Sequence, residues 1–348
     1  MSLISLSKKL FYQTKQLLPI WLRSNGLLKG LESRSALNQP LLTEAEMVAL
    51  ADDLALLTQR IVANPKLSEA LRQGEQSSPF MGAGLEYEES RPYEMGDEIR
   101  RINWRLMAKT GQVYTKLFQE ERQESWVILV DQRQSMRFGT RVRLKATQAA
   151  RVAGYFAWLA QQANVPVVGA RIAESFTLTP SFEGRGTYSH LMESFAVACP
   201  PLSAEEVRNE PHINDVLLAL KQQLQPGSRL VLISDFHDIN QKTTEILTAL
   251  QQTAMLKAIV IKDRVEFELP NVEGLQLQSI TNQHIHQLTT QSQRTSYQAW
   301  SKGYHQRLHS FLQQAGVDPI IIMADEPTSA LKAVQVHSQK SAGGRYAS

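Results

Sequence analysis

The sequence predicts an α/β protein built on a doubly wound, mostly parallel sheet. Two short apolar runs, WVILVD at 126–131 and RLVLISD at 229–235, end in aspartate and have the pattern of strands buried on both faces. Helical and strand patterns alternate between and after these runs, which is the pattern of βαβ units. Hydrophobic residues make up 43% of the 348 residues and charged residues 20%, a composition that excludes a mostly disordered chain.

The predicted elements follow one another closely from residue 126 onward. A helix over 141–162 comes after the first strand, because its apolar side chains recur at helical spacing. The remaining elements, in order, are strands at 165–172 and 175–179, helices at 188–197 and 213–224, a strand at 229–235, a helix at 242–251, strands at 257–261 and 275–280, a helix at 297–315 and a strand at 319–323.

The N-terminal third is expected to be organised differently. Thr43 followed by Glu46 is a capping box ahead of an apolar-periodic helix over 47–62. The polar stretch GEQSSP at 74–79 marks a boundary, and residues 1–22 suggest an amphipathic helix.

These patterns divide the chain into four parts. The predicted division is a helical N-terminal extension at 1–78, a β-rich insert at 79–125, the α/β domain at 126–335 and a flexible tail at 336–348.

Charge, cysteine content and hydropathy limit the function classes. There are 37 Lys and Arg and 34 Asp and Glu, so the net charge is 37 − 34 = +3, which predicts no bulk attraction to nucleic acid. The single cysteine, Cys199, excludes an internal disulfide and suits a reducing compartment, so a cytoplasmic location is expected. No apolar run approaches the ~18 to 20 residues of a membrane span, so no integral membrane segment is expected.

Four oxygen-bearing side chains are predicted to meet at one edge of the sheet. In doubly wound sheets ligands bind beyond the carboxyl ends of the strands, where Asp131 and Asp235 fall. Ser135 follows the first strand, and Thr187 follows a Gly-Arg-Gly turn at a helix start. A set of carboxylates and hydroxyls suits a hard cation such as Mg²⁺.

This constellation resembles the metal-ion-dependent adhesion site of the von Willebrand factor A fold. The first strand of that family ends in Asp-x-Ser-x-Ser, and Asp131, Ser135, Thr187 and Asp235 match the pattern. Arg133 stands where the family has the first Ser, and a guanidinium donates hydrogen bonds but cannot coordinate a cation. Arg133 is therefore expected to pair with Asp131 and Asp235 in place of a metal, which leaves either no cofactor or Mg²⁺ at a degenerate site.

A second resemblance covers about residues 80–335. Several motifs of the domain-of-unknown-function-58 (DUF58) family occur in order: GAGLEY at 82–87, RPYEMGD at 91–97, RRINW at 100–104, LK at 144–145, SDF at 234–236 and DRVE at 263–266. Tyr87, Asn103, Lys109 and Arg133 depart from the pattern, in which Phe, Asp, Arg and Ser stand.

The resemblance implies a non-enzymatic scaffold or adaptor. Members of this family are associated with MoxR-type AAA+ ATPases and other von Willebrand A-domain proteins, in assembly or maturation of protein complexes. Two alternatives at the same edge stay open, a metal-dependent hydrolase that uses Asp131, Asp235 and Asp238, and a Mg²⁺-dependent adhesion module.

The segment from Arg91 to Lys116 allows two interpretations. Its cations and carboxylates either form an internal brace or a polar docking surface with aromatic anchors. We expect the brace, because paired arginines and buried aromatics are common in interiors. The residues singled out as an interaction or structural motif are Arg91, Tyr93, Gly96, Asp97, Arg100, Trp104 and Arg133.

No sequence motif points to catalysis. His305 and His309 are spaced i, i+4, but the intervening residues lack the Glu of a zinc-protease motif. A phosphate-binding Gly-x-x-x-x-Gly-Lys-Ser/Thr loop and a Gly-x-Ser-x-Gly nucleophile elbow are both absent from the sequence. We therefore expect the chain neither to hydrolyse ATP nor to be an enzyme.

Overall fold

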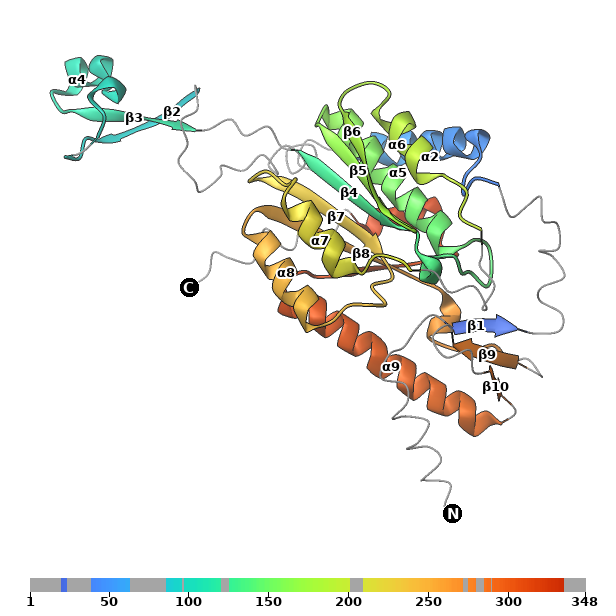
Figure 1. Cartoon of the computed structure of the whole chain (residues 1–348). Helices are drawn as coiled ribbons and strands as arrows, with labels where there is room; N and C mark the ends of the chain where they lie inside the picture. The colour runs from blue at the N-terminus through green and yellow to red at the C-terminus, as the bar shows by residue number, and fades with distance from the viewer. Residues whose placement is uncertain are drawn as a thin grey trace. The chain divides into compact units, whose positions relative to one another are not determined.

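A computed structural model describes most of the chain in two compact units (Figure 1). The described residues are 20–23, 39–62, 86–95, 97–119, 125–200, 209–271, 275–279, 285–288 and 290–334. The first unit comprises Met1–Arg60 and Ser125–Ser348, and the second comprises Ile61–Glu124. The four-part division from the sequence stays a prediction.

The first unit contains a six-stranded sheet with the order β11-β8-β7-β4-β5-β6. Its strands are β4 (Trp126–Asp131), β5 (Val167–Ile172), β6 (Phe176–Phe182), β7 (Ser228–Ser234), β8 (Ala254–Lys262) and β11 (Ile320–Met323). All neighbours pair in parallel except β5 and β6, which are antiparallel. The predicted doubly wound, mostly parallel, von Willebrand A-like sheet is thus confirmed.

Helices cover both faces of this sheet (Figure 1). One face packs against α2 (Glu44–Val62), α5 (Lys145–Ala163) and α6 (Thr187–Phe195). The other packs against α7 (Ile213–Lys221), α8 (Gln241–Gln251) and α9 (Gln291–Gln314). Because β4 lies in the middle of the sheet, all six of its residues are buried, as its continuous apolar run predicts.

The predicted capping box at the start of α2 is confirmed. The backbone N–H of Thr43 donates to Glu46 Oε2 at 2.8 Å, and the Glu46 N–H donates to Thr43 Oγ1 at 3.3 Å. The Tyr188 hydroxyl, from α6, donates to the Met47 carbonyl at 2.7 Å, and Leu50 is buried in the core. This helix of the N-terminal extension therefore packs onto the α/β core.

A separate three-stranded antiparallel sheet belongs to the same unit. Its strands are β1 (Ile20–Arg23), β9 (Leu275–Ser279) and β10 (Ile285–Leu288), with β9 in the centre. The expected helical character of the N-terminus is wrong at Ile20–Arg23, because this apolar stretch rich in β-formers pairs with β9. Residues 1–19 and 336–348 lie outside the described residues.

The second unit is a two-stranded antiparallel sheet with short helices between its strands. Strand β2 (Glu86–Pro92) pairs with β3 (Tyr114–Gln119), and the connection contains η3 (Ile99–Arg101) and α4 (Trp104–Thr110). The sequence predicted a β-rich insert at 79–125 but not the helix α4. Asn103 starts α4, since its Oδ1 accepts a hydrogen bond from the Leu106 N–H at 3.1 Å.

The described helices include none with the length and apolar character that a membrane span requires.

Gly169 has no side chain, and this lets α6 pack directly on the backbone of β5. A Cβ at this position would lie 2.9 Å from Leu191 Cδ2, 3.0 Å from Phe195 Cζ and 3.1 Å from Thr179 Cγ2. We expect Gly169→Ala to lower the free energy of unfolding by about 1–3 kcal/mol, because the well-packed core must shift. Urea denaturation followed by circular dichroism measures this change.

Gly303 provides the control for that substitution. It lies inside α9, and a Cβ there would approach no atom closer than Arg307 Nη1 at 3.6 Å. Gly303→Ala is expected to raise the free energy of unfolding by about 0.5–1 kcal/mol, since alanine is the better helix former. Equal effects of the two substitutions would contradict the packing described for β5.

Candidate functional site

Asp131 and Asp235 lie at the same edge of the sheet. Asp131 is the last residue of β4, and Asp235 directly follows the neighbouring parallel strand β7. One oxygen of each carboxylate and a ring nitrogen of His237 all lie within 4.8 Å of one another. The exposed fractions are 0% for Asp131 and 2% for Asp235, so both carboxylates are removed from solvent.

Arg133 places a buried guanidinium beside one of these carboxylates. Its Nε donates to Asp131 Oδ1 at 3.0 Å and its Nη2 to Asp131 Oδ2 at 2.8 Å. The other side of the guanidinium donates to Asp238, from Nη1 at 2.5 Å and from Nη2 at 3.0 Å. Nη1 also donates to the Pro211 carbonyl at 3.0 Å. All five N–H donors of the guanidinium are thereby used.

The second partner of Arg133 differs from the one predicted. Arg133 bridges Asp131 and Asp238, whereas Asp235 pairs with Lys145. The Lys145 Nζ lies 2.8 Å from Asp235 Oδ2 and 2.9 Å from Glu266 Oε1. Asp238 is closer to Arg133 because the chain turns at Phe236, which adopts a φ of 53°.

A second lysine completes this cluster. The Lys262 Nζ lies 3.1 Å from Glu266 Oε2 and donates to the Asp235 carbonyl at 3.1 Å. Sequence reasoning assigned no role to Lys145 or Glu266, although both lie in segments that resemble the DUF58 pattern, 144–145 and 263–266. These two family motifs were the signal in the sequence that could have identified Lys145 and Glu266 as site residues.

Ser135, His237 and Asp235 are in contact but do not form a catalytic triad. Ser135 Oγ lies 3.0 Å from His237 Nδ1 and donates to Asp235 Oδ1 at 3.2 Å. The same ring nitrogen, Nδ1, lies 3.1 Å from Asp235 Oδ1. A triad uses one ring nitrogen for the hydroxyl and the other for the carboxylate, so this geometry does not activate the serine.

Thr187 is not part of this site, which corrects the prediction. Strand β6 runs antiparallel to β5, so its last residue, Phe182, pairs with Val167 at the amino edge of the parallel strands. Thr187 follows shortly after, where the next residue, Tyr188, donates its N–H to Gln161 near the end of α5. Asp131 pairs with the opposite end of β5, about 16 Å of strand away.

The segment before α7 supplies the contact at the carboxyl edge that was predicted for Thr187. The N–H of Gln134 donates to Glu210 Oε1 at 2.8 Å and Oε2 at 3.0 Å. Burial raises the pKa of Glu210. No sequence motif marked Glu210, which lies in the long connection between α6 and α7, outside any helix or strand.

The charges of this cluster balance when His237 is protonated. The cations are Arg133, Lys145, Lys262 and His237, and the anions are Asp131, Asp235, Asp238 and Glu266, so the sum is 4 − 4 = 0. Burial raises the pKa of Asp235, but the nearby Lys145 and His237 outweigh it and hold that pKa well below its usual range. In the same way His237 and Arg133 overcome burial and lower the pKa of Asp238 to about 2.

The residues present do not fit a divalent metal. Asp131 already accepts four hydrogen bonds, three from the Arg133 backbone and side chain and one from Ser234 Oγ at 2.6 Å. Asp235 also accepts four, from Ser135, Lys145 and the backbone and ring of His237. Asp131 thereby uses its roughly four lone-pair positions, whereas on Asp235 three bonds fall on Oδ1 and the Lys145 ammonium alone on Oδ2. A bound Mg²⁺ would face a guanidinium and an ammonium.

The Arg91 motif forms a brace within the second unit. Arg91 Nη2 lies 2.6 Å from Asp97 Oδ1, and Asp97 Oδ2 accepts from the Glu94 N–H and from Thr115 Oγ1, each at 3.0 Å. The hydrogen bond from the Glu94 backbone is the main cause that lowers the pKa of Asp97. These contacts fix the turn after β2.

The other residues of that predicted motif lie apart from the brace. Trp104 is 59% exposed at the start of α4, and Arg100 is exposed. Tyr93 is partly buried and continues the pairing of β2 with β3 through its N–H to the Val113 carbonyl. Gly96 lies outside the described residues, and Arg133 belongs to the first unit.

Removing the guanidinium should destabilise the first unit strongly. Arg133→Met would leave Asp131 and Asp238 buried without their cation, so we expect the free energy of unfolding to fall by about 3–5 kcal/mol. Chemical denaturation at pH 7 measures the change. Arg141→Met is the control, because Arg141 is 59% exposed and its ion pair with Asp325 is longer, at 3.7 Å. A loss no larger than that of the control would contradict the role given to Arg133.

His237 should make stability decrease as pH rises. Burial lowers its pKa, but Asp235 and Asp238 outweigh burial and the repulsion of Arg133, so the pKa is raised above the ordinary value of 6.5. Protonated His237 therefore stabilises the fold fully below about pH 6.5, and this contribution is lost as the pH rises through the folded-state pKa. Unfolding free energies of the wild type and His237→Asn, measured from pH 6 to 9, should show a steeper decline for the wild type. Parallel curves would contradict the assignment.

Comparison with known proteins places the chain in a family. The model of the family described as "Protein of unknown function DUF58" matches residues 89–307. Uncharacterized proteins of Mycobacterium tuberculosis and Mycobacterium bovis are 30% identical over 228 residues, which are 64% of this chain and 69% of each relative.

Solved structures give weaker likenesses. A conserved hypothetical protein, BatB, from Bacteroides thetaiotaomicron aligns with a TM-score of 0.41 and 15% identity, over 63% of this chain and 98% of that one. A von Willebrand factor type A protein from Catenulispora acidiphila aligns with a TM-score of 0.36 and 10% identity, over 66% and 44%. The strand order and connections described above, and not these alignments, carry the fold assignment.

The family match covers more than half of the chain. The chain therefore belongs to the DUF58 family.

Proposed function

We propose that this chain is a non-enzymatic interaction protein that acts with a MoxR-type AAA+ ATPase in the assembly or maturation of other protein complexes. One observation carries the non-enzymatic part of the proposal. The two carboxylates at the carboxyl edge of the sheet, Asp131 and Asp235, each accept four hydrogen bonds from the chain's own side chains and backbone, and each faces a buried cation.

The two alternatives need carboxylate positions that here face the chain's own cations, Arg133 and Lys145. A metal-dependent hydrolase or a Mg²⁺-dependent adhesion site requires carboxylate lone pairs that are free to bind an ion. Asp238, the third carboxylate considered for hydrolysis, accepts from Arg133 and from the Ile213 N–H at 2.9 Å. Although Asp131, Asp235 and His237 lie close enough together to share an ion, the adjacent Arg133 and Lys145 disfavour both alternatives, and the proposal includes no cofactor.

The buried charges give the carboxyl edge a fixed shape. They join the ends of β4, β7 and β8 to the start of α5 and to the segment before α7. Ion pairs with both partners buried hold their geometry tightly, because any displacement would leave a charge unpaired in a medium of low dielectric constant. A rim fixed in this way can present exposed side chains to a partner without reorganising.

A docking surface at the carboxyl edge must lie outside the buried acidic residues. Asp131, Ser135 and Asp235 are at most 2% exposed, so a partner cannot touch them in this structure. The loop between β4 and α5 instead exposes Arg141 and Val142, whose exposed fractions are 59% and 68%. We propose this loop as the centre of the docking surface.

Two features support an ATPase as the partner. The sequence motifs resemble those of a family associated with MoxR-type AAA+ ATPases, and the chain belongs to that family. The sequence contains no phosphate-binding loop, so energy from nucleotide hydrolysis would have to come from another protein.

A charge placed in the rim loop should weaken the complex. We expect Val142→Asp to raise the Kd for the purified MoxR-type ATPase of the same organism about tenfold or more, because an exposed apolar contact would be replaced by a desolvated carboxylate. Leu178→Asp is the matched control, since Leu178 is 41% exposed and lies in β6, the outermost strand of the sheet on the side of β5. Biolayer interferometry in the presence of Mg²⁺ and ATP measures both constants.

The same preparation distinguishes the alternatives. No saturable binding of the ATPase, or equal weakening by both substitutions, would overturn the proposed partner or surface. Calorimetric titration of the chain alone with MgCl₂ should give no binding heat. A stoichiometric heat that disappears in Asp131→Asn would favour the adhesion module instead.

A further inference from the structure

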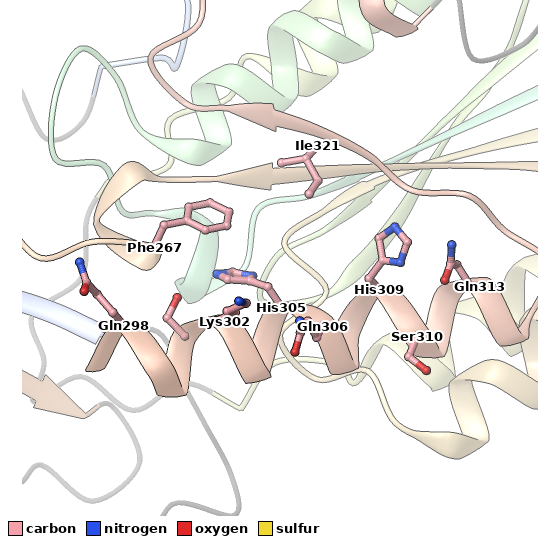
Figure 2. Close-up of a pocket in the computed structure, with 10 residues that line it drawn as sticks. Phe267, Gln298, Lys302, His305, Gln306, His309, Ser310, Gln313 and Ile321 are labelled. Atoms are coloured by element: carbon pink, nitrogen blue, oxygen red, sulfur yellow. The ribbon is translucent and has the colours of Figure 1, made fainter. Parts of the chain in front are cut away.

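A groove runs between α9 and the edge strand β11 (Figure 2). Its volume is about 400 Å³, and it is lined by four turns of α9, from Gln298 to Gln313, together with Phe267 and Ile321. The groove lies on the opposite face of the sheet from α5, because Ile320 and Ile322 point into the core beneath α5 while Ile321 lines the groove.

The outer edge of β11 offers a single backbone donor. Ala324 donates its N–H to the Lys262 carbonyl in β8, so alternation directs the amides of residues 319, 321 and 323 away from β8. Pro319 has no N–H, and the Met323 N–H donates to Glu326 Oε2 at 3.0 Å. Ile321 is therefore the one position of β11 where both backbone groups can pair with an added strand.

The side chain of Ile321 provides an apolar contact at that position. It is 48% exposed, whereas Ile320 and Ile322 are 4% and 1% exposed. Phe267 stacks on His305 with ring centroids 4.2 Å apart and forms another wall of the groove. An extended segment placed beside β11 would cover Ile321 while its alternate side chains reached α9.

The charge of the groove selects the kind of segment. The 24 residues of α9 include three cations, Arg294, Lys302 and Arg307, and no Asp or Glu. No carboxylate lines the groove among the described residues, and the Lys302 ammonium is exposed there. Burial and the nearby Lys262 lower the pKa of His305 to about 4, so this ring is neutral at pH 7 and adds no repulsion to Lys302. The field at the groove therefore favours carboxylates.

We propose that this groove binds an extended acidic segment of a partner protein, which adds a short strand at Ile321 and places a carboxylate near Lys302. The register is restricted to Ile321 because Pro319 and Glu326 block strand pairing on either side. This surface is independent of the rim loop at Val142, so either proposal can fail without the other.

A peptide probe tests the chemistry of the groove. The probe is a fluorescein-labelled hexapeptide of alternating Glu and Val, and fluorescence anisotropy with the full chain should show saturable binding with a Kd below about 1 mM. A peptide of alternating Lys and Val should bind at least tenfold more weakly, and so should the Glu and Val peptide with a central Pro, which cannot donate to the strand. No saturable binding, or equal binding of the basic peptide, would overturn the proposal.

Two substitutions locate the binding. Lys302→Glu should raise the Kd at least tenfold, and Ile321→Pro should do the same because it removes the outward N–H. Lys242→Glu, an exposed charge reversal in α8, is the matched control and should change the Kd less than twofold. Lys302→Glu decides the outcome if Ile321→Pro fails to fold. Unchanged affinity in folded Lys302→Glu, or full competition by single-stranded DNA, would show that the peptide does not recognise this groove.

Discussion

The contact between the Arg133 guanidinium and its two aspartates is the constraint on which the carboxyl edge of the sheet depends. A buried arginine does not lose its proton, so the folded chain must surround the guanidinium with hydrogen-bond acceptors. Asp131, Asp238 and the Pro211 carbonyl supply those acceptors from three separate segments. The loops after β4 and β7 and the segment before α7 therefore have one mutual arrangement in which every donor is satisfied, and Lys145 applies the same requirement to Asp235 and Glu266.

The sequence predicts the sheet well because a strand buried on both faces is apolar along its whole length. The site depends instead on the direction of each strand and on which residues far apart in the chain meet. WVILVD at 126–131 is apolar throughout, and the structure buries every residue of it. The prediction that Thr187 belongs to the site is wrong for a reason that composition cannot reveal. The strand before it, β6, runs antiparallel, so the chain reaches the amino edge of the sheet before α6 begins. A single reversed strand thus moved a matching residue to the wrong end of the domain.

The ion pairs show a different limit of sequence reasoning. Asp235 and Asp238 are three positions apart, and only the turn at Phe236 decides which of them faces Arg133. Lys145 and Glu266 lie 121 positions apart, since 266 − 145 = 121, and meet because two strands end at the same edge. Pairing over such distances follows from the completed topology, so the residues could be recognised by family resemblance but their partners could not be assigned.

A tethered guanidinium and a dissociable ion differ in how a site built on them can be controlled. A divalent ion exchanges with solvent and can respond to its concentration, but Arg133 is covalently fixed and stays charged at any physiological pH. Buried ion pairs also contribute more to a defined geometry than to net stability. The buried ion pairs therefore favour one shape of the carboxyl edge, and in the complex proposed above any switching would originate in the partner. A nucleotide-driven ATPase that cycles between conformations would supply such a switch, which is the physical reason for proposing it, and not an ion-gated ligand, as the partner of this rim.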